Sequence, residues 1–210
     1  MRPKGLTLWL PRHGLGIIHC DIKPENIVLD DYDTGAVKLI DFGSSCFASD
    51  RLSTYVQSRS YRAPEVVLGL EYDALIDVWS LGCVLAEAWS GYVLFQNDSL
   101  ATMLARLIAI LGPIPTRMLD EAPNTHRFFT ASGNVYERFA QGQDDLAPGQ
   151  DAYVLLFPKR TSLANRLHLD HDDLFADFVH ALLSVDPNSR PSPATAKLHP
   201  FLAPSEPGTT

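Results

Sequence analysis

The sequence predicts a mainly α-helical domain that carries one small β-hairpin. Residues 73–91 are apolar around most of a helical circumference, which is typical of a helix at the centre of a core. Two further apolar runs, 99–111 and 174–183, begin at or after residues that commonly cap helices. Between residues 27 and 40, two short β-branched runs flank a polar, turn-forming linker, and that pattern predicts a hairpin.

The first half of the chain is organised around that hairpin. Residues 1–16 contain prolines and glycines at short intervals, so no helix of normal length fits there. The hairpin would hold Asn26 at one end and Asp41 at the other, close together in space. The stretch 43–62 is polar, rich in serine and without periodicity, and a loop of that length in a compact domain is usually functional.

The second half contains a long stretch with weak periodicity. Residues 113–170 hold prolines, glycines and scattered aromatic residues, which predict an irregular insert. We expect Phe128–Phe129 and the stretch 153–157 to anchor this insert by packing. A short helix over 192–199 then closes the domain, and residues 203–210 are expected to be disordered.

The composition limits the classes of function. A length of 210 residues, 46% of them apolar, allows one large globular domain or two small ones. The net charge of −8 argues against nonspecific binding to nucleic acid or to an anionic membrane. The three cysteines are far apart in sequence and form no CxxC pair, so they suit free thiols in the cytoplasm or the nucleus. No apolar segment is long enough for a signal peptide or a membrane span.

Three short motifs follow one another along the chain. They are His19–Asn26 (HCDIKPEN), Asp41–Gly43 (DFG) and Ala63–Glu65 (APE). In this order they resemble the catalytic loop, the metal-binding turn and the substrate-loop anchor of a protein kinase. A chance cluster of charged residues in a turn is the alternative, and the three ordered motifs disfavour it.

The chain thus resembles the protein kinase superfamily and, within it, the dual-specificity tyrosine-regulated (DYRK) family. The closer resemblance lies in His-Cys-Asp in place of the usual His-Arg-Asp, in Asp41–Cys46 (DFGSSC) and in Tyr55–Arg62 (YVQSRSYR). Residues 97–99 and 161–163 look most like the plant and algal branch of the family. The resemblance implies the α+β kinase fold, with the mainly helical C-terminal lobe present.

The resemblance also implies a set of residues for phosphoryl transfer. Asp21 would orient the substrate hydroxyl and accept its proton, and Lys23 would offset negative charge on the transferred phosphate. Asn26 and Asp41 would be oxygen ligands for Mg²⁺, which bridges the phosphates of ATP. Val28 would form the floor under the adenine ring. The implied cofactors are ATP and Mg²⁺.

Several further residues are implied to hold the site together. His19 would pack under Phe42 and fix the catalytic loop relative to the metal-binding turn, with a proton shuttle as the alternative. Asp77, in the central helix, would accept hydrogen bonds from amides of the catalytic loop, with a surface carboxylate as the alternative. Glu65 and Arg190 would form a buried ion pair, and a solvated pair is the alternative.

The polar loop has one implied phosphorylation site. Tyr55 would be autophosphorylated, and Arg59 and Arg62 would bind its phosphate. Ser53 stands where the resembled family has a further tyrosine. Together with Thr54, it is a competing site that ranks lower.

Two other interpretations of reactive residues remain as alternatives. Cys20 replaces an arginine that clamps an activation-loop phosphate in many kinases, and it could be redox-active. No second cysteine lies near it in sequence, which disfavours that interpretation. The segment His168–Asp173 gathers several potential metal ligands, but helix capping and solvated charge explain it more simply.

The resemblance runs over nearly the whole chain and predicts a non-matching segment at 1–13, a kinase C-terminal lobe at 14–202 and the disordered tail. The family's glycine-rich loop, strand lysine and helix glutamate have no counterpart before Gly14. We therefore expect the N-terminal lobe to be absent. The long helix that precedes the catalytic loop would be absent too, which should leave apolar surface of the 73–91 helix exposed.

The expected function is that of a serine/threonine, dual-specificity protein kinase lobe that transfers the ATP γ-phosphate to protein hydroxyls. The lobe is expected to be truncated and inactive by itself. Its partners would be protein substrates, ATP and a missing N-terminal lobe, with no nucleic acid and no membrane. A non-catalytic protein-binding module derived from a kinase is the alternative. The expected location is cytoplasmic, nuclear or both.

Overall fold

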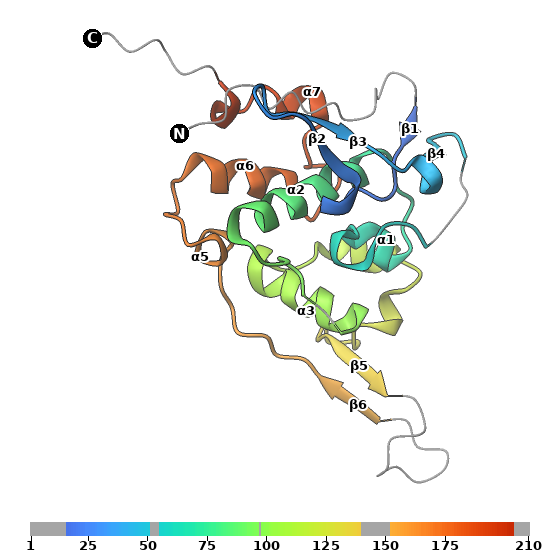
Figure 1. Cartoon of the computed structure of the whole chain (residues 1–210). Helices are drawn as coiled ribbons and strands as arrows, with labels where there is room; N and C mark the ends of the chain where they lie inside the picture. Colours follow the sequence, from blue (N-terminus) through green and yellow to red (C-terminus); the bar gives the residue numbers. More distant parts are fainter. Residues whose placement is uncertain (1–15, 51–54, 97, 140–151, 204–210) are drawn as a thin grey trace.

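The structure is a computed structural model that describes residues 16–50, 55–96, 98–139 and 152–203 (Figure 1). The predicted segment 1–13 and all but the first residue of the predicted disordered tail lie outside these ranges. The described residues form a mainly helical lobe with small antiparallel sheets, which confirms the mainly α-helical part of the predicted fold class. No helix within these ranges is long and apolar enough to cross a membrane.

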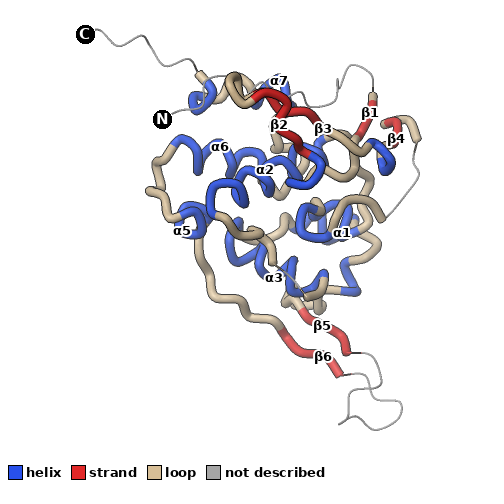
Figure 2. The backbone as a smooth tube through the Cα atoms, viewed as in Figure 1, coloured by secondary structure: helices blue, strands red, loops and turns tan. Residues whose placement is uncertain are grey.

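Figure 2 colours the helices and strands by type. The described α-helices are α1 (Pro64–Leu68), α2 (Leu75–Ser90), α3 (Leu100–Leu111), α4 (Thr116–Glu121), α5 (Leu163–Leu167), α6 (Leu174–Leu182) and α7 (Pro193–Ala196). The described 3-10 helices are Pro24–Asn26, Phe42–Ser44, Arg59–Tyr61, Thr125–Arg127 and Pro200–Leu202. The strands are β1 (Ile17–Ile18), β2 (Ile27–Asp31), β3 (Ala36–Leu39), β4 (Cys46–Phe47), β5 (Tyr136–Phe139) and β6 (Ala152–Leu155).

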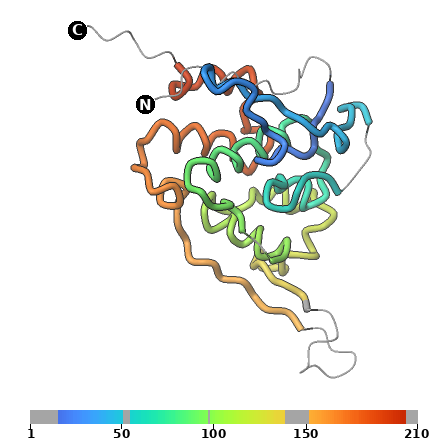
Figure 3. Tube along the Cα trace, viewed as in Figure 1, coloured from blue at the N-terminus to red at the C-terminus, as the bar shows by residue number. Residues whose placement is uncertain are grey.

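Helix α2 lies at the centre of the lobe and packs side by side with α6 (Figure 3). Val78 and Leu81 of α2 form a buried apolar cluster with Phe178 and Leu182 of α6. Gly82 allows this approach, because a Cβ there would lie 2.9 Å from the side chain of Leu183. The predicted exposure of apolar surface on this helix is therefore wrong along Ile76–Val84, where every residue is buried.

The helix ends show why these segments fold locally. Ser99 begins α3 with a capping box, in which its hydroxyl accepts from the Thr102 amide and the Thr102 hydroxyl accepts from the Ser99 amide. Asp173 begins α6, and its carboxylate accepts from the amides of Phe175 and Ala176 at 2.8 and 3.2 Å. The capping interpretation of the acidic cluster before α6 is thereby confirmed.

Three antiparallel strand pairs occur among the described residues, whereas the sequence predicts one. The β2–β3 hairpin has the predicted position, and Ile27 pairs with Leu39. The β1–β4 pair joins two-residue strands with 27 residues between them, which is too short and too distant a pattern to detect in sequence. The β5–β6 pair lies within the predicted irregular insert.

The two predicted anchors of the insert differ in how much of them is buried. Phe128 and Phe129 are buried in the main core, as predicted. Tyr153 and Phe157 are 67% and 76% exposed, so the prediction that the stretch 153–157 packs inward is wrong for these residues. Leu156 is partly buried against the main core, and the prediction is confirmed there. The reason at Tyr153 is that it belongs to β6, and the β5–β6 ribbon projects from the helical body (Figure 1).

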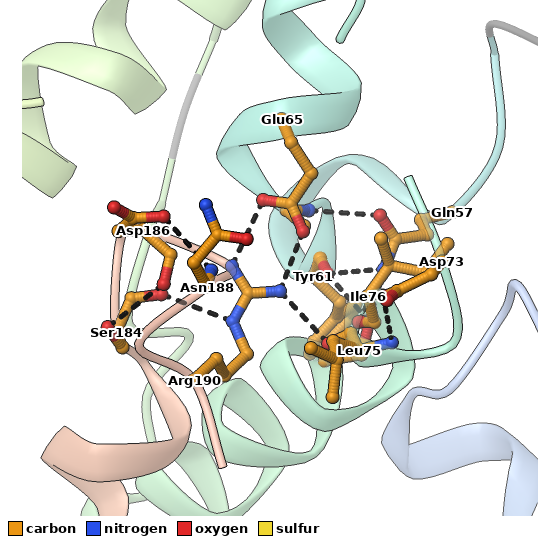
Figure 4. A network of polar contacts seen from close by, with 12 residues as sticks. Gln57, Tyr61, Glu65, Asp73, Leu75, Ile76, Ser184, Asp186, Asn188 and Arg190 are labelled. Carbon is orange, nitrogen blue, oxygen red and sulfur yellow. Dashed lines mark hydrogen bonds and ion pairs between the residues drawn. The ribbon is translucent and has the colours of Figure 1, made fainter. Parts of the chain in front are cut away.

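A buried ion pair connects the start of α1 to the chain after α6 (Figure 4). Arg190 donates to both carboxylate oxygens of Glu65, at 2.6 and 3.0 Å, and both side chains are at most 1% exposed. The guanidinium also donates to the carbonyl oxygens of Leu75 and Ser184, and it lies over the ring of Trp79. The predicted buried pair is confirmed over the solvated alternative.

We predict that Arg190→Met lowers the free energy of unfolding by about 3–5 kcal/mol, because it leaves the Glu65 carboxylate buried without its counter-charge. Urea unfolding followed by circular dichroism measures this change. Lys197→Met removes one positive charge from an exposed residue and serves as the matched control. A loss for Arg190→Met within about 1 kcal/mol of that control would contradict the prediction.

Candidate active site

The catalytic loop is held from below by a buried carboxylate on α2. The amide of His19 donates to Asp77 Oδ2 at 2.7 Å, and the amide of Cys20 donates to Oδ1 at 3.0 Å. Asp77 is 1% exposed. Burial raises its pKa to about 6, and the two amide hydrogen bonds oppose that rise. The geometry is the one predicted for Asp77, and the surface alternative is wrong.

The His19 ring connects the catalytic loop to the end of the hairpin. Its Nδ1 accepts from the Asp21 amide at 3.3 Å, and its Nε2 lies 3.2 Å from the carbonyl oxygen of Ile40. Both contacts are satisfied by one neutral tautomer, in which Nε2 carries the proton. The ring also meets Phe42 edge-on at a centroid distance of 4.7 Å. These contacts are those of a structural residue, as the sequence predicts.

The Asp21 carboxylate is held on both oxygens. Lys23 Nζ donates to Oδ2 at 2.7 Å, and Ser58 Oγ donates to Oδ1 at 2.7 Å. Asn26 Nδ2 donates to the Asp21 carbonyl oxygen at 2.8 Å and to Oδ2 at 3.2 Å. Partial burial works against ionisation, but the hydrogen bonds from Lys23 and Ser58 outweigh it and lower the pKa of Asp21. The carboxylate is therefore ionised and fixed in orientation at neutral pH.

Two residues of this arrangement were not predicted, Gln57 and Ser58. The buried Gln57 side chain donates to the Ile76 carbonyl oxygen at 2.9 Å and to Ser80 Oγ at 2.8 Å. Its Oε1 accepts from the Ala63 amide at 2.9 Å (Figure 4). Gln57 has a φ of 68°, and this fixed turn presents Ser58 to Asp21. Gln57 and Ser58 lie in a polar loop without periodicity, so the sequence pattern there could not indicate these long-range hydrogen bonds.

The β2–β3 hairpin brings Asn26 and Asp41 to neighbouring positions, as predicted. The Ile40 amide donates to the Asn26 carbonyl oxygen at 2.9 Å, so the next residue, Asp41, leaves the hairpin beside Asn26. Asp41 has a left-handed backbone with φ 62°, and its Oδ1 accepts from the Gly43 amide at 3.2 Å. A Cβ on Gly43 would lie 3.1 Å from that oxygen, so glycine leaves room for the carboxylate.

The side-chain oxygens of Asn26 and Asp41 fit Mg²⁺, which prefers hard oxygen donors. Asn26 Nδ2 is engaged by Asp21, which leaves Oδ1 as the ligating atom. Within the described ranges, no three His, Cys, Asp or Glu side chains gather into a metal site of their own. A cation held here would therefore take further ligands from elsewhere, and phosphate oxygens and water suit it. Val28, on β2, is 36% exposed beside this site.

The loop that follows places its predicted phosphorylation site next to two arginines. Arg62 lies over the exposed ring of Tyr55, 4.1 Å from the centroid, and donates to the carbonyl oxygens of Val56 and Gln57. Arg59 donates to the Asp98 carbonyl oxygen at 3.2 Å. Hydrogen bonding and charge from Arg62, followed by the charge of Arg59, lower the pKa of Tyr55. The competing sites, Ser53 and Thr54, lie outside the described residues.

Comparison with known proteins finds similarity over most of the chain. A family model described as "Protein kinase domain" matches residues 12–202. The serine/threonine-protein kinase ppk15 of Schizosaccharomyces pombe is 40% identical over 207 residues, covering 89% of this chain and 39% of that protein. The dual specificity tyrosine-phosphorylation-regulated kinase mbk-2 of Caenorhabditis elegans is 41% identical over 194 residues, covering 89% of this chain and 24% of that protein.

A mammalian relative gives a similar picture. The dual specificity tyrosine-phosphorylation-regulated kinase 3 of Mus musculus is 38% identical over 207 residues, covering 93% of this chain and 34% of that protein. The chain therefore spans less than half the length of each of these three relatives, between 24% and 39%.

The raised pKa of Asp77 predicts a pH-dependent stability. The folded state binds this proton more tightly than the unfolded chain does. The resulting stabilisation is complete below about pH 4 and is lost as the pH rises through about 6. The side-chain amide of the Asp77→Asn variant does not titrate in this range. The stability of the parent relative to Asp77→Asn should therefore fall by up to about 3 kcal/mol between about pH 4 and about pH 7.

Urea unfolding of both proteins over this pH range measures the difference. Asp172→Asn, which removes an exposed carboxylate, is the matched control for the loss of one acid. A difference between parent and Asp77→Asn that stays constant, or that grows in favour of the parent as the pH rises, would contradict the prediction.

Proposed function

This chain belongs to the protein kinase family, and we propose that it is the catalytic lobe of a dual-specificity, serine/threonine protein kinase of the DYRK type. The lobe transfers the γ-phosphate of ATP to protein hydroxyl groups. The observation that carries the proposal is the Asp21 carboxylate, held on one oxygen by Lys23 and on the other by Ser58. A surface used only for binding would not require an ionised carboxylate fixed in this way.

In the proposed reaction, Asp21 orients the hydroxyl of the protein substrate and accepts its proton. The hydrogen bonds that lower its pKa make it a weak base, so its main contribution is orientation. Lys23 is about a quarter exposed, so its ammonium can reach a phosphate while it contacts Asp21. Positioning and charge neutralisation supply most of the rate enhancement in phosphoryl transfer.

Nucleotide and metal belong on the face formed by the hairpin. Asn26 and Asp41 would hold Mg²⁺ through their side-chain oxygens, and the ion supplies charge neutralisation when it is bound. Val28 would contact the adenine ring, consistent with its partial exposure on β2. ATP and Mg²⁺ are the cofactors that the protein kinase family uses.

We further propose that a nucleotide-covering lobe packs on this face. Ile40 and Phe42 flank Asp41, and Val28 lies two residues after Asn26. These three apolar residues are between 36% and 48% exposed. Apolar side chains gathered beside a polar site are typical of a surface that another unit covers. The described lobe by itself would then be inactive. A non-catalytic binding module remains the second candidate, and this exposed apolar face is the observation that favours it.

The branch of the family, the cellular location and the class of partner are also proposals. Residues 97–99 and 161–163 support a place in the plant and algal branch of the family. The free thiols of Cys20, Cys46 and Cys83 suit a cytoplasmic or nuclear location. The net charge of −8 suits protein substrates better than nucleic acid or an anionic membrane.

The direct test joins the chain to the nucleotide-covering lobe of one of its relatives and measures transfer of phosphate from ATP to a generic protein substrate. We predict that Asp21→Ala and Asp41→Ala each lower turnover by at least about a thousandfold. The first removes the carboxylate that orients the hydroxyl, and the second removes an oxygen ligand for Mg²⁺.

Asp33→Ala, in the turn of the hairpin, removes an exposed acid and should leave turnover unchanged. Turnover of Asp21→Ala within about tenfold of the parent would overturn the proposed function.

We predict that the active protein carries phosphate on Tyr55. A phosphate there adds nearly two negative charges and three acceptor oxygens next to Arg59 and Arg62, which would order the loop. Phosphopeptide mapping by mass spectrometry locates the modification. Tyr32, which is 89% exposed, is the internal control for nonspecific modification and should carry none. Phosphate on Thr54 with Tyr55 unmodified would reject this assignment.

A further inference from the structure

The β5–β6 ribbon is a two-stranded sheet with two edges. Its register is regular, from Tyr136 opposite Leu155 to Phe139 opposite Ala152. Among the residues that the structure describes, no third strand joins this sheet. The ribbon lies at the end of the lobe away from β2 and β3, so a partner on it would leave the proposed site open (Figure 1).

The outer edge of β5 is partly used within the chain. The Tyr136 amide donates to the Phe128 carbonyl oxygen at 2.8 Å, which ties this edge to the helical body. β5 also carries a glutamate and an arginine within its four residues. Charged residues on an edge strand disfavour pairing with a further strand. A partner is therefore better accommodated on β6.

The outer edge of β6 has unpaired backbone groups. The Leu156 amide donates to the Val135 carbonyl oxygen at 2.9 Å, across the ribbon. Because successive residues of a strand direct their backbone groups to opposite sides, the amides and carbonyl oxygens of Tyr153 and Leu155 point away from β5. No backbone hydrogen bond within the described ranges uses these groups. They can pair with another strand.

The side chains along this edge are apolar and exposed. Residues 152–157 read Ala-Tyr-Val-Leu-Leu-Phe, without a charge or a proline. Tyr153, Val154, Leu155 and Phe157 are between 41% and 76% exposed. The register of the ribbon contains no bulge that would twist the edge away from a partner. An exposed apolar edge strand without any of these protections is typical of a strand that pairs with another chain.

The charges around β6 indicate which chain that is. In the sequence, Asp144, Asp145 and Asp151 precede the strand, and Lys159 and Arg160 follow it. Two identical strands that pair antiparallel bring the acidic end of each beside the basic end of the other, which is favourable. A parallel pair would bring like charges together. The strand is thus complementary to an antiparallel copy of itself.

We propose that β6 is a self-association surface, on which β6 of a second copy of this chain pairs antiparallel across a two-fold axis. The two ribbons then form one four-stranded sheet. With Leu155 opposite Leu155 of the partner subunit, Asp151 stands opposite Lys159 of the partner subunit. Such a two-fold contact uses the same surface on both copies and closes at a dimer. This inference does not depend on the proposed kinase activity.

The size of the contact predicts a weak dimer. The paired segment is about six residues long, whereas each partner of a standard interface contributes roughly 20–30 residues. We therefore expect a reversible dimer with a dissociation constant in the micromolar range or above.

Sedimentation velocity of the purified, reduced chain over a range of concentrations tests the proposal. The average mass should rise from that of a monomer toward that of a dimer as the concentration passes through the micromolar range. Leu155→Lys places two positive charges opposite each other at the centre of the pair and should raise the dissociation constant at least about tenfold. Leu198→Lys makes the same change at a leucine that is 82% exposed outside the ribbon, and it should dimerise like the parent.

A second pair of variants separates strand pairing from a contact between side chains alone. Leu155→Pro removes an amide that points away from β5, and a proline is tolerated at such a position of an edge strand. Leu155→Ala shortens the side chain but keeps the amide. We expect Leu155→Pro to raise the dissociation constant more than Leu155→Ala does. Circular dichroism and the melting temperature check that both variants fold.

A parent chain that stays monomeric at every concentration would overturn the proposal. A dimer that Leu155→Lys and Leu198→Lys weaken equally would also overturn it, because the contact would then lie elsewhere on the lobe. Equal dissociation constants for folded Leu155→Pro and Leu155→Ala would show that the two copies do not pair through the backbone of β6.

Discussion

Two hydrogen bonds from the backbone of the catalytic loop to the Asp77 carboxylate connect the polar site to the core. A buried carboxylate is costly without partners, and a buried amide is costly without an acceptor, so each group compensates the other. Because α2 is packed on several sides, it fixes the position of His19 and Cys20 within the fold. The left-handed backbone of Cys20 shows that the loop adopts an uncommon conformation to make these contacts.

Short polar contacts connect α2 to the rest of the site and fix its side chains in position. The His19 ring contacts the Ile40 carbonyl oxygen at the end of the hairpin. This contact also positions the next residue, Asp41, which begins the turn that follows. On the other side, Gln57 donates to α2 and thereby places Ser58 against the Asp21 carboxylate. The catalytic loop, the metal-binding turn and the substrate loop are distant in sequence, yet contacts that begin at α2 position all three. The thiol contact between Cys20 and Cys46 is a further consequence of that convergence.

Local patterns in the sequence predicted the elements whose signals are local. The continuous apolar run of α2, the caps at Ser99 and Asp173 and the β2–β3 hairpin all lie within a few residues of their signals. Motif resemblance predicted the long-range pair of Glu65 and Arg190, which no local pattern shows. Neither the local patterns nor the motif resemblance indicated the roles of Ser58 and Gln57 or the β1–β4 ladder, because the tertiary fold determines their partners. The outward position of Tyr153 was missed for the same reason, since an aromatic residue predicts burial only where a core is within reach.

Amide hydrogen exchange at the catalytic loop tests the central claim most directly. The account predicts that the amides of His19 and Cys20 exchange as slowly as those in the middle of α2, because both donate to a carboxylate that belongs to its core. In Asp77→Asn, which offers one acceptor in place of two, at least one of these amides should exchange about a hundredfold faster while α2 stays protected. Equal exchange rates in the parent and in a folded Asp77→Asn protein would contradict the claim that this carboxylate holds the site.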